Sequence, residues 1–178
     1  SATMTNPPTF DAPPVLAGHY CLISPVRNEA DYMRRTLDSV IGQTVPPDLW
    51  VIVDDGSTDE TPAILADYAA RVPFIRVVTR ADRGHRAVGG GVIEAFNAGL
   101  AAVGEARHEF LCKLDMDLIL PPAYFETLMA EMRADPRLGS VSGKAYYPGP
   151  ANAGARFDGD LISEAIAEVD SPDGVLVL

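Results

Sequence analysis

Cysteine, tryptophan and long apolar runs are all scarce in this sequence of 178 residues. Its two cysteines, Cys21 and Cys112, each lie within an apolar run, and two are too few for the disulfide framework of a small secreted domain. No stretch reaches the roughly 18 consecutive apolar residues of a membrane-spanning helix. We therefore expect a reduced, cytoplasmic chain with no membrane span. Association with a membrane could still come from parts of the protein outside this chain.

Positive charge is also in short supply. The chain has 14 Lys and Arg residues against 25 Asp and Glu residues, which gives a formal net charge of −11 at pH 7. Binding to a nucleic-acid backbone requires a dense basic face that displaces counterions, so we expect no nucleic-acid partner. A small phosphate-bearing ligand remains compatible with this charge, because a metal ion or a helix N-terminus can supply the missing positive charge.

What the sequence does contain is an alternation of short apolar runs and helical patterns. With 47% hydrophobic residues and only 15 each of Gly and Pro, it is a globular rather than a low-complexity chain. Strands are expected at 20–24, 49–53, 74–78, 110–114 and 140–147. Helices are expected at 33–41, 64–69, 92–103 and 121–135. Alternating strands and helices predict an α/β fold with a doubly wound, mostly parallel sheet.

The pattern divides the chain into three regions. Residues 1–18 contain four prolines and little periodicity, so we expect a Pro-rich arm or linker. Residues 19–147 hold the α/β domain. Residues 148–178 have a loop-like start, a short helical pattern at 161–169 and a final strand of four aliphatic residues. Because an exposed apolar strand invites aggregation, we expect the chain to be truncated at its C-terminus.

Polar residues follow the first strand at the carboxyl edge of the sheet, where ligands bind in such folds. Asn28 is placed to cap the next helix, and Asp31 would lie in its first turn, where the helix dipole favours an acid. A capped helix alone would account for these two residues.

A stronger indication of a site follows the second strand. Ser57 and Glu60 have the spacing of a capping box, which is local structure. Capping does not require Asp54 and Asp55, whose adjacent carboxylates repel each other and cost stability unless something uses them. We therefore expect a ligand role for at least one of the two.

The fourth strand leads into Asp115-Met116-Asp117. In extended chain, residues i and i+2 project to the same side, so both carboxylates can face one hard cation. Two carboxylates with open positions are typical of an Mg²⁺ or Mn²⁺ site that shares its cation with a substrate. The alternative is a pair of solvated acids in a loop.

A basic, glycine-rich segment lies between the third strand and its helix. Arg80, Arg83 and Arg86 fall within seven positions, and three glycines follow at 89–91. Glycine-rich backbone beside a helix N-terminus can approach a pyrophosphate, and arginines can assist. A solvated surface loop is the other interpretation of this segment.

Taken in order, these segments resemble the family 2 glycosyltransferases, inverting enzymes with the Rossmann-like GT-A fold. The matching residues are 25–29, 54–59, Asn97-Ala98-Gly99 and 115–117. The resemblance covers residues 19 to about 147, the half of the fold that binds the donor nucleotide. Residues 148–178 would then begin an incomplete acceptor-side region.

The resemblance implies a nucleotide-sugar site and its residues. The implied donor-binding residues are Pro25, Arg27, Glu29, Asp54, Asp55 and Asp115. Among them, Pro25 and Arg27 would line the base and ribose pocket, and Asp55 would accept a hydrogen bond from the base. Asp117, with Asp115 beside it, would hold Mn²⁺ or Mg²⁺ on the diphosphate.

Two departures from the family pattern qualify these expectations. Many relatives carry Arg or Lys shortly before the Asn-x-Gly of the third helix, whereas 89–96 has none here. Arg83 or Arg86 is expected to take over that diphosphate contact. The family's catalytic base should lie well downstream of Asp117, so we expect it beyond Leu178.

The expected function is therefore sugar transfer, with inversion and with metal assistance, from a nucleotide-diphosphate donor to an acceptor hydroxyl. The donor expected from the resemblance is a UDP-sugar, and the acceptor is a saccharide, a lipid-linked molecule or a small molecule. The alternative is a non-catalytic nucleotide-binding or regulatory module of the same fold. The resemblance also implies strand order 3-2-1-4, which would bring Cys21 and Cys112 close together in the core.

Overall fold

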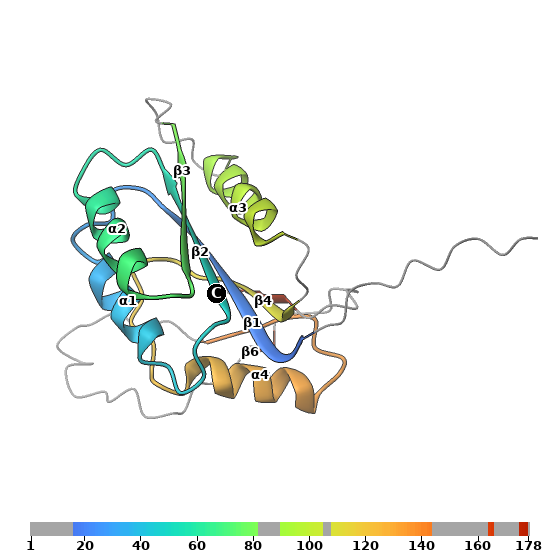
Figure 1. Cartoon of the computed structure of the whole chain (residues 1–178). Coiled ribbons are helices and arrows are strands. Elements are labelled where there is room, and N and C mark those ends of the chain that lie inside the picture. Colours follow the sequence, from blue (N-terminus) through green and yellow to red (C-terminus); the bar gives the residue numbers. More distant parts are fainter. Residues whose placement is uncertain (1–15, 82–89, 105–107, 144–163, 166–174, 178) are drawn as a thin grey trace, which may run out of the picture.

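A parallel sheet with the strand order β3-β2-β1-β4-β7 forms the centre of the protein (Figure 1). The computed structural model describes residues 16–81, 90–104, 108–143, 164–165 and 175–177. The sheet strands are β1 (Leu16–Val26), β2 (Leu49–Asp55), β3 (Ile75–Arg80), β4 (His108–Lys113) and β7 (Val175–Val177). All neighbouring pairs in this sheet are parallel, as the alternating pattern predicts.

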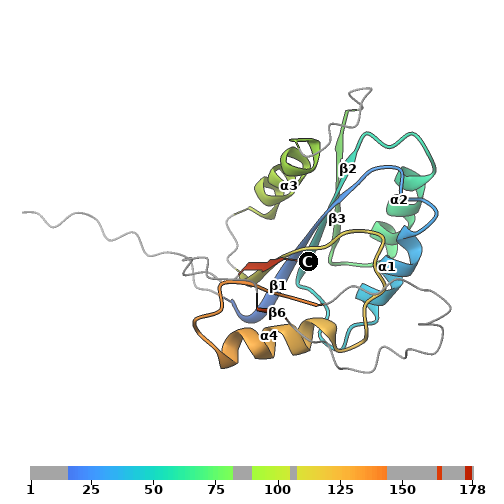
Figure 2. The ribbon, with the colours of Figure 1, turned by 180° about the vertical axis from the view of Figure 1, so that it is seen from behind.

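Four helices cover the two faces of the sheet. They are α1 (Met33–Ile41), α2 (Thr61–Arg71), α3 (Gly90–Val103) and α4 (Tyr124–Ala134). α1, α2 and α4 pack on one face, and α3 packs on the other (Figure 1, and from behind in Figure 2). The predicted α/β class and the order of these elements are confirmed, and α1 has the bounds that its apolar spacing predicted. None of the described helices has the length and apolar character needed to cross a membrane.

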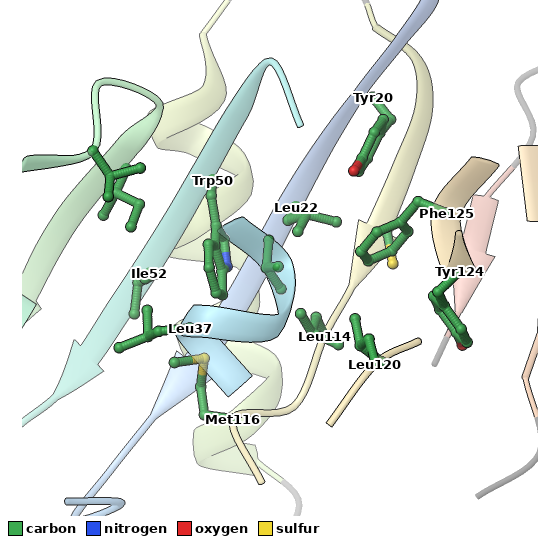
Figure 3. Packing of buried hydrophobic residues seen from close by; sticks show 14 of the residues in the cluster. Tyr20, Leu22, Leu37, Trp50, Ile52, Leu114, Met116, Leu120, Tyr124 and Phe125 are labelled. Carbon is green, nitrogen blue, oxygen red and sulfur yellow. The ribbon is translucent and has the colours of Figure 1, made fainter. Parts of the chain in front are cut away.

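The larger core lies between the sheet and α1, α2 and α4. Trp50 is its largest fully buried side chain, and its indole N–H donates to Ser24 Oγ at 2.9 Å. Tyr20 of β1 packs on Phe125 of α4 with ring centroids 4.9 Å apart (Figure 3). Buried aromatic residues provide much of the apolar area that stabilises such a core. This packing fixes β1, β2 and β4, whose carboxyl ends carry the polar residues described below.

The smaller core joins α3 to the other face, and a glycine sets its spacing. A Cβ atom on Gly99 would lie 2.5 Å from Ile23 Cγ2 and 3.1 Å from Val53 Cγ2. Both are methyl groups of β-branched, fully buried side chains, so they have little freedom to move away. The glycine of the Asn97-Ala98-Gly99 segment therefore allows α3 to lie directly on the sheet.

The two cysteines are buried and free, as predicted, but they do not face each other. The register pairs Leu22 with Cys112, so Cys21 is one residue out of step with Cys112. Because successive side chains in a strand point to opposite faces, the two thiols lie on opposite sides of the sheet. The two cysteines are thus close, on neighbouring strands, as predicted, but their thiols point to opposite faces of the sheet and do not share one core. Burial raises the pKa of the Cys21 thiol to about 12, so this thiol stays protonated.

Two further predictions for the C-terminal part need correction. The fifth strand expected at 140–147 is described only as β5 (Val141–Ser142), which leaves the main sheet and pairs antiparallel with β6 (Glu164–Ala165). The helix expected at 161–169 is contradicted at 164–165, where pairing with β5 makes the backbone extended. The strand expected at the end of the chain is confirmed as β7, which lies beside β4. The predicted arm at 1–18 falls mainly outside the described residues.

Candidate functional site

A pocket of about 330 Å³ opens at the carboxyl edge of the sheet, where β1, β2 and β4 end beside the start of α3. Its lining residues are Pro25, Val26, Arg27, Glu29, Asp55, Gly91, Val92, Ala95, Lys113, Asp115, Met116 and Asp117. The structure thus brings together six of the predicted site residues: Pro25, Arg27, Glu29, Asp55, Asp115 and Asp117. This position is where ligands bind in doubly wound sheets. Arg83 and Arg86 lie outside the described residues.

Asp55 is held on the pocket wall by two arginines. Arg27 Nη1 donates to the backbone oxygen of Asp55 at 3.1 Å, and Arg80 Nη1 donates to its Oδ1 at 3.0 Å. Arg80 also reaches Glu94 of α3 at 3.2 Å. A charge-assisted hydrogen bond such as the one from Arg80 fixes the position of a carboxylate. Arg80 therefore orients Asp55, a role that its place in a basic loop segment did not reveal.

Asp54 has a different position from its neighbour. Its side chain is buried, and its Oδ1 accepts a hydrogen bond from the Ser57 backbone N–H at 3.0 Å. It is not among the residues that line the pocket. The carboxylate thus stabilises the turn after β2, and a donor-binding role for Asp54 stays a prediction.

The capping box predicted for Ser57 and Glu60 is wrong. α2 begins at Thr61, and its N-cap residue, Glu60, makes no side-chain capping hydrogen bond. The Ser57 hydroxyl instead accepts the backbone N–H of Asn28 at 3.0 Å. A contact between residues 29 positions apart in the chain has replaced the local bond that the spacing suggested.

Asn28 does not cap α1 but binds the loop after β2. α1 begins only at Met33, and the N-cap position belongs to Tyr32, so Asp31 also precedes the helix. Asn28 adopts a left-handed backbone with φ of 52°, and its Oδ1 accepts the backbone N–H groups of Thr58 and Asp59 at 2.8 and 3.3 Å. Asparagine tolerates this backbone better than most residues. The prediction that Asn28 caps the next helix is therefore wrong.

Further bonds tie the same two loops together. Asp59 accepts the backbone N–H of Ala30 at 3.3 Å, and Thr61 Oγ1 accepts that of Glu29 at 3.1 Å. Burial works against the charge of Asp59, but hydrogen bonds from Thr61 and Ala30 hold its pKa below the usual value. The polar residues after β1 and β2 thus form one hydrogen-bonded unit. This unit presents Arg27, Glu29 and Asp55 to the pocket.

The Asp115-Met116-Asp117 segment has the alternation that its sequence predicts. Met116 is buried in the larger core, whereas Asp115 and Asp117 are exposed and line the pocket. The anchored methionine directs both neighbouring carboxylates toward the same opening. Lys113, the last residue of β4, forms an ion pair with Asp115. Sequence analysis did not single out Lys113, although its position two residues before Asp115 places it at the same edge.

Polar side chains of α1 and of the residues just after it support this segment from behind. Thr36 Oγ1 donates to the Met116 carbonyl at 2.9 Å, and Ser39 Oγ accepts the Leu120 N–H at 3.2 Å. Gln43 donates to the Pro121 carbonyl at 2.7 Å and accepts the Phe125 N–H at 3.2 Å. Thr36 and Ser39 lie three residues apart on α1, and Gln43 follows just after the helix ends at Ile41. Polar residues beside the buried apolar stripe of α1 were the available signal for this support, and sequence analysis missed it.

The carboxylates fit a metal that is shared with a ligand. In the described part of the chain, no three His, Cys, Asp or Glu residues are grouped so that they could hold an ion. Mg²⁺ and Mn²⁺ prefer about six oxygen ligands, so Asp117 and Asp115 would leave most positions to other groups. Asp115 is already paired with Lys113, which leaves Asp117 as the better ligand. These residues suit a cation that arrives with a phosphate-bearing molecule.

Comparison with known proteins gives a family match over most of the chain. Residues 21–158 match the sequence model described as "Glycosyl transferase family 2". The "Chondroitin synthase" of Pasteurella multocida is 30% identical over 139 residues, which are 78% of this chain and 13% of that protein. The chain therefore spans only a small part of this relative.

Solved structures agree on the fold. The mannosyltransferase PcManGT of Pyrobaculum calidifontis, in complex with GDP-Man and Mn²⁺, matches with a TM-score of 0.56 and 27% identity. That match covers 71% of this chain and 36% of PcManGT. S. aureus TarS 1–349 in complex with UDP-GlcNAc matches with a TM-score of 0.54 and 21% identity, covering 73% and 37% of the two chains. The predicted GT-A-like fold is confirmed by these matches.

Proposed function

This chain belongs to glycosyl transferase family 2, and on that premise we propose that its pocket binds a UDP-sugar for inverting transfer to an acceptor hydroxyl. The observation that carries the proposal is the pocket itself. Asp55, held by Arg80, occupies one wall, and Asp115 and Asp117 occupy another. A carboxylate that can pair with a base and two that can share a cation thus face one cavity, which has the chemistry of a nucleoside diphosphate site.

Asp55 is the base-recognising residue in this proposal. An ionised carboxylate only accepts hydrogen bonds, and the N3–H of uracil is a donor. Cytosine has no N–H at the corresponding ring position, so a fixed carboxylate there favours UDP over CDP. Arg27 holds the Asp55 backbone and Arg80 holds its carboxylate, so the side chain keeps one orientation, which makes that discrimination effective.

Asp117 and Asp115 are the residues that would hold Mn²⁺ or Mg²⁺. When bound, such a cation neutralises the negative charge that develops on the leaving diphosphate. Asp117 would anchor the diphosphate end of the donor through that charge, while Asp115 and Lys113 form the adjoining wall. The neighbours bound to GDP-Man with Mn²⁺ and to UDP-GlcNAc support this proposal. The carboxylate that deprotonates the acceptor is proposed to follow Leu178, as the family resemblance implies.

Nucleotide binding by matched variants tests the proposal. Calorimetry with UDP, CDP, GDP and dTDP in Mn²⁺ should show tightest binding of UDP to the wild-type chain. Asp55→Asn should weaken UDP binding by roughly tenfold and lower the preference for UDP over CDP, since the amide presents a donor as well as an acceptor. Asp67→Asn is the control, because Asp67 lies exposed on α2 and pairs with Arg71 in the same helix.

The outcome separates recognition from a purely structural role. If Asp55→Asn lowered the melting temperature and left both nucleotide affinities unchanged, the base-recognising role would be wrong. If the wild-type chain preferred GDP, the family assignment would stand and the UDP-sugar donor would have to be replaced. Binding of UDP by the whole protein without any sugar transfer would favour the non-catalytic nucleotide-binding alternative.

A further inference from the structure

The pocket holds more negative than positive side chains. Among the described residues that line it, four are acidic and two are basic: Glu29, Asp55, Asp115 and Asp117 against Arg27 and Lys113. A diphosphate group is itself an anion, so it would meet net repulsion in this pocket. Binding of a nucleoside diphosphate therefore requires cations placed at the phosphate end as well as carboxylates at the base end.

The start of α3 provides no such cation. Its pocket-lining residues are Gly91, Val92 and Ala95, none of which carries a charge. Arg27 also lies at the other end of the site, where its guanidinium donates to the backbone of Asp55. Among the described residues that line the pocket, Lys113 is therefore the basic residue that lies beside Asp115 and Asp117. It contacts this pair through its ion pair with Asp115.

The backbone directs Lys113 toward the α3 side of the pocket. The register pairs Lys113 of β4 with Ile23 of β1, so their side chains share one face of the sheet. Ile23 meets α3 at Gly99, which identifies this face as the one that α3 covers. Lys113 thus projects toward the side of the pocket that α3 forms, and α3 has no basic residue.

The contact with Asp115 prepares Lys113 for an anion. A lysine ammonium has three N–H donors and no acceptor, so the bond to Asp115 leaves donors for another oxygen. The ion pair also restricts a flexible side chain, which is 26% exposed, and so reduces the entropy lost when a ligand binds. An ammonium group is a compact charge that suits phosphate oxygens.

We propose that Lys113 binds the diphosphate of the donor and supplies, from β4, the positive charge that α3 lacks. This inference rests on the proposed nucleotide-sugar function and adds a binding residue to it. Because Lys113 is part of the chain, its contribution persists when no metal is present. That property separates it from Asp117, whose contribution requires the metal.

Calorimetry with UDP and with uridine tests the proposal, because the two ligands share the base and ribose and differ in the diphosphate. Lys113→Met should weaken UDP binding by about tenfold, which corresponds to about 1.4 kcal/mol, both in Mn²⁺ and in EDTA. Uridine binding should change less than about twofold, and Lys113→Arg should keep most of the UDP affinity. Arg71→Met is the control, since Arg71 also pairs with an aspartate but lies on α2 away from the pocket.

A double-mutant cycle excludes an indirect effect through Asp115. Removal of Lys113 leaves Asp115 without its ion-pair partner, and that carboxylate alone could repel the diphosphate. In an Asp115→Asn background, direct contact predicts that Lys113→Met still causes most of its loss of UDP affinity. The melting temperatures of all variants should lie close to one another. A difference in UDP affinity then cannot be explained by unfolding of a variant.

Three results would overturn the proposal. They are an equal loss of UDP and uridine binding, an unchanged UDP affinity, and a loss that disappears when Asp115 is already neutral. A diphosphate-specific loss in Arg83→Met or Arg86→Met, with none in Lys113→Met, would assign the contact to the basic loop. If the wild-type chain binds uridine and UDP equally, or neither, the proposed UDP-sugar donor itself is wrong. UDP binding that Lys113→Met leaves intact contradicts only this inference.

Discussion

Asn28, Ser57 and Asp59 show how residues that look like helix caps can hold a site together instead. Their side chains bond the backbone of the opposite loop, so the turn after β1 and the turn after β2 become one unit. Each bond satisfies a backbone N–H that lies outside regular secondary structure. The consequence is that Arg27, just after β1, and Asp55, the last residue of β2, keep a fixed separation.

Asn28→Ala should therefore destabilise the chain. The substitution removes the acceptor for two backbone N–H groups and places alanine in a left-handed backbone, so we expect a loss of about 2 kcal/mol. Asn28→Gly keeps the backbone accessible and removes only the side chain, so its loss should be smaller. Urea unfolding of the three proteins measures both effects. Equal stability of Asn28→Ala and wild type would show that the loop connection contributes nothing.

At the scale of elements, α3 can lie close to the sheet because Gly99 has no side chain at the point of contact. Gly99 allows the helix to rest on Ile23 and Val53, and the same helix brings Gly91, Val92 and Ala95 to the pocket. A change in the distance between α3 and the sheet would therefore alter the pocket as well as the core.

Gly99→Ala tests this coupling. Its Cβ cannot fit 2.5 Å from Ile23 Cγ2, so α3 must shift, and we expect a loss of roughly 1–3 kcal/mol in unfolding free energy. UDP affinity should fall with it, because the shifted helix carries part of the pocket wall. In an Ile23→Ala background, where the closest contact is removed and only that with Val53 Cγ2 remains, Gly99→Ala should cost much less. A full loss in both backgrounds would mean that the helix does not depend on this close contact.

The sequence predicted the helices and strands better than it predicted which residues contact one another across the fold. β2 and α1 were found because buried strands are continuous apolar runs and covering helices repeat every three or four residues. The roles of Ser57 and Asn28 were missed because their spacing fits a local cap, whereas their partners come from another loop. The facing of Cys21 and Cys112 depends on a one-residue register between strands, which no single strand encodes.

For the candidate site, the sequence predicted its place at the carboxyl edge of the sheet, but not the residues that hold the site residues in position. Strand-end acids such as Asp55 and Asp117 meet at one edge in any doubly wound sheet. Thr36, Arg80 and Lys113 were missed because each acts on another site residue across the fold, through a contact that depends on packing.

At the scale of the whole molecule, an acidic chain must bind an acidic ligand. The formal charge of −11 opposes a nucleoside diphosphate at long range, although salt reduces this effect. Local cations therefore decide whether the donor binds. We assign this task to Lys113 within the chain and to a divalent ion held by Asp117, and we assign selection of the base to Asp55 at the other end of the pocket.

The most direct test of this account measures how strongly the metal and the nucleotide depend on each other through Asp117. Each ligand should raise the affinity of the other by the same factor, because coupling between two sites is reciprocal. Asp117→Asn keeps the size of the side chain and removes its charge. Calorimetry with UDP, in Mn²⁺ and in EDTA, on wild type and this variant gives the four affinities. We predict a loss of at least roughly tenfold in Mn²⁺, about 1.4 kcal/mol, and little change in EDTA. Equal losses in both conditions would contradict the account, because Asp117 would then contact the nucleotide itself or support the fold.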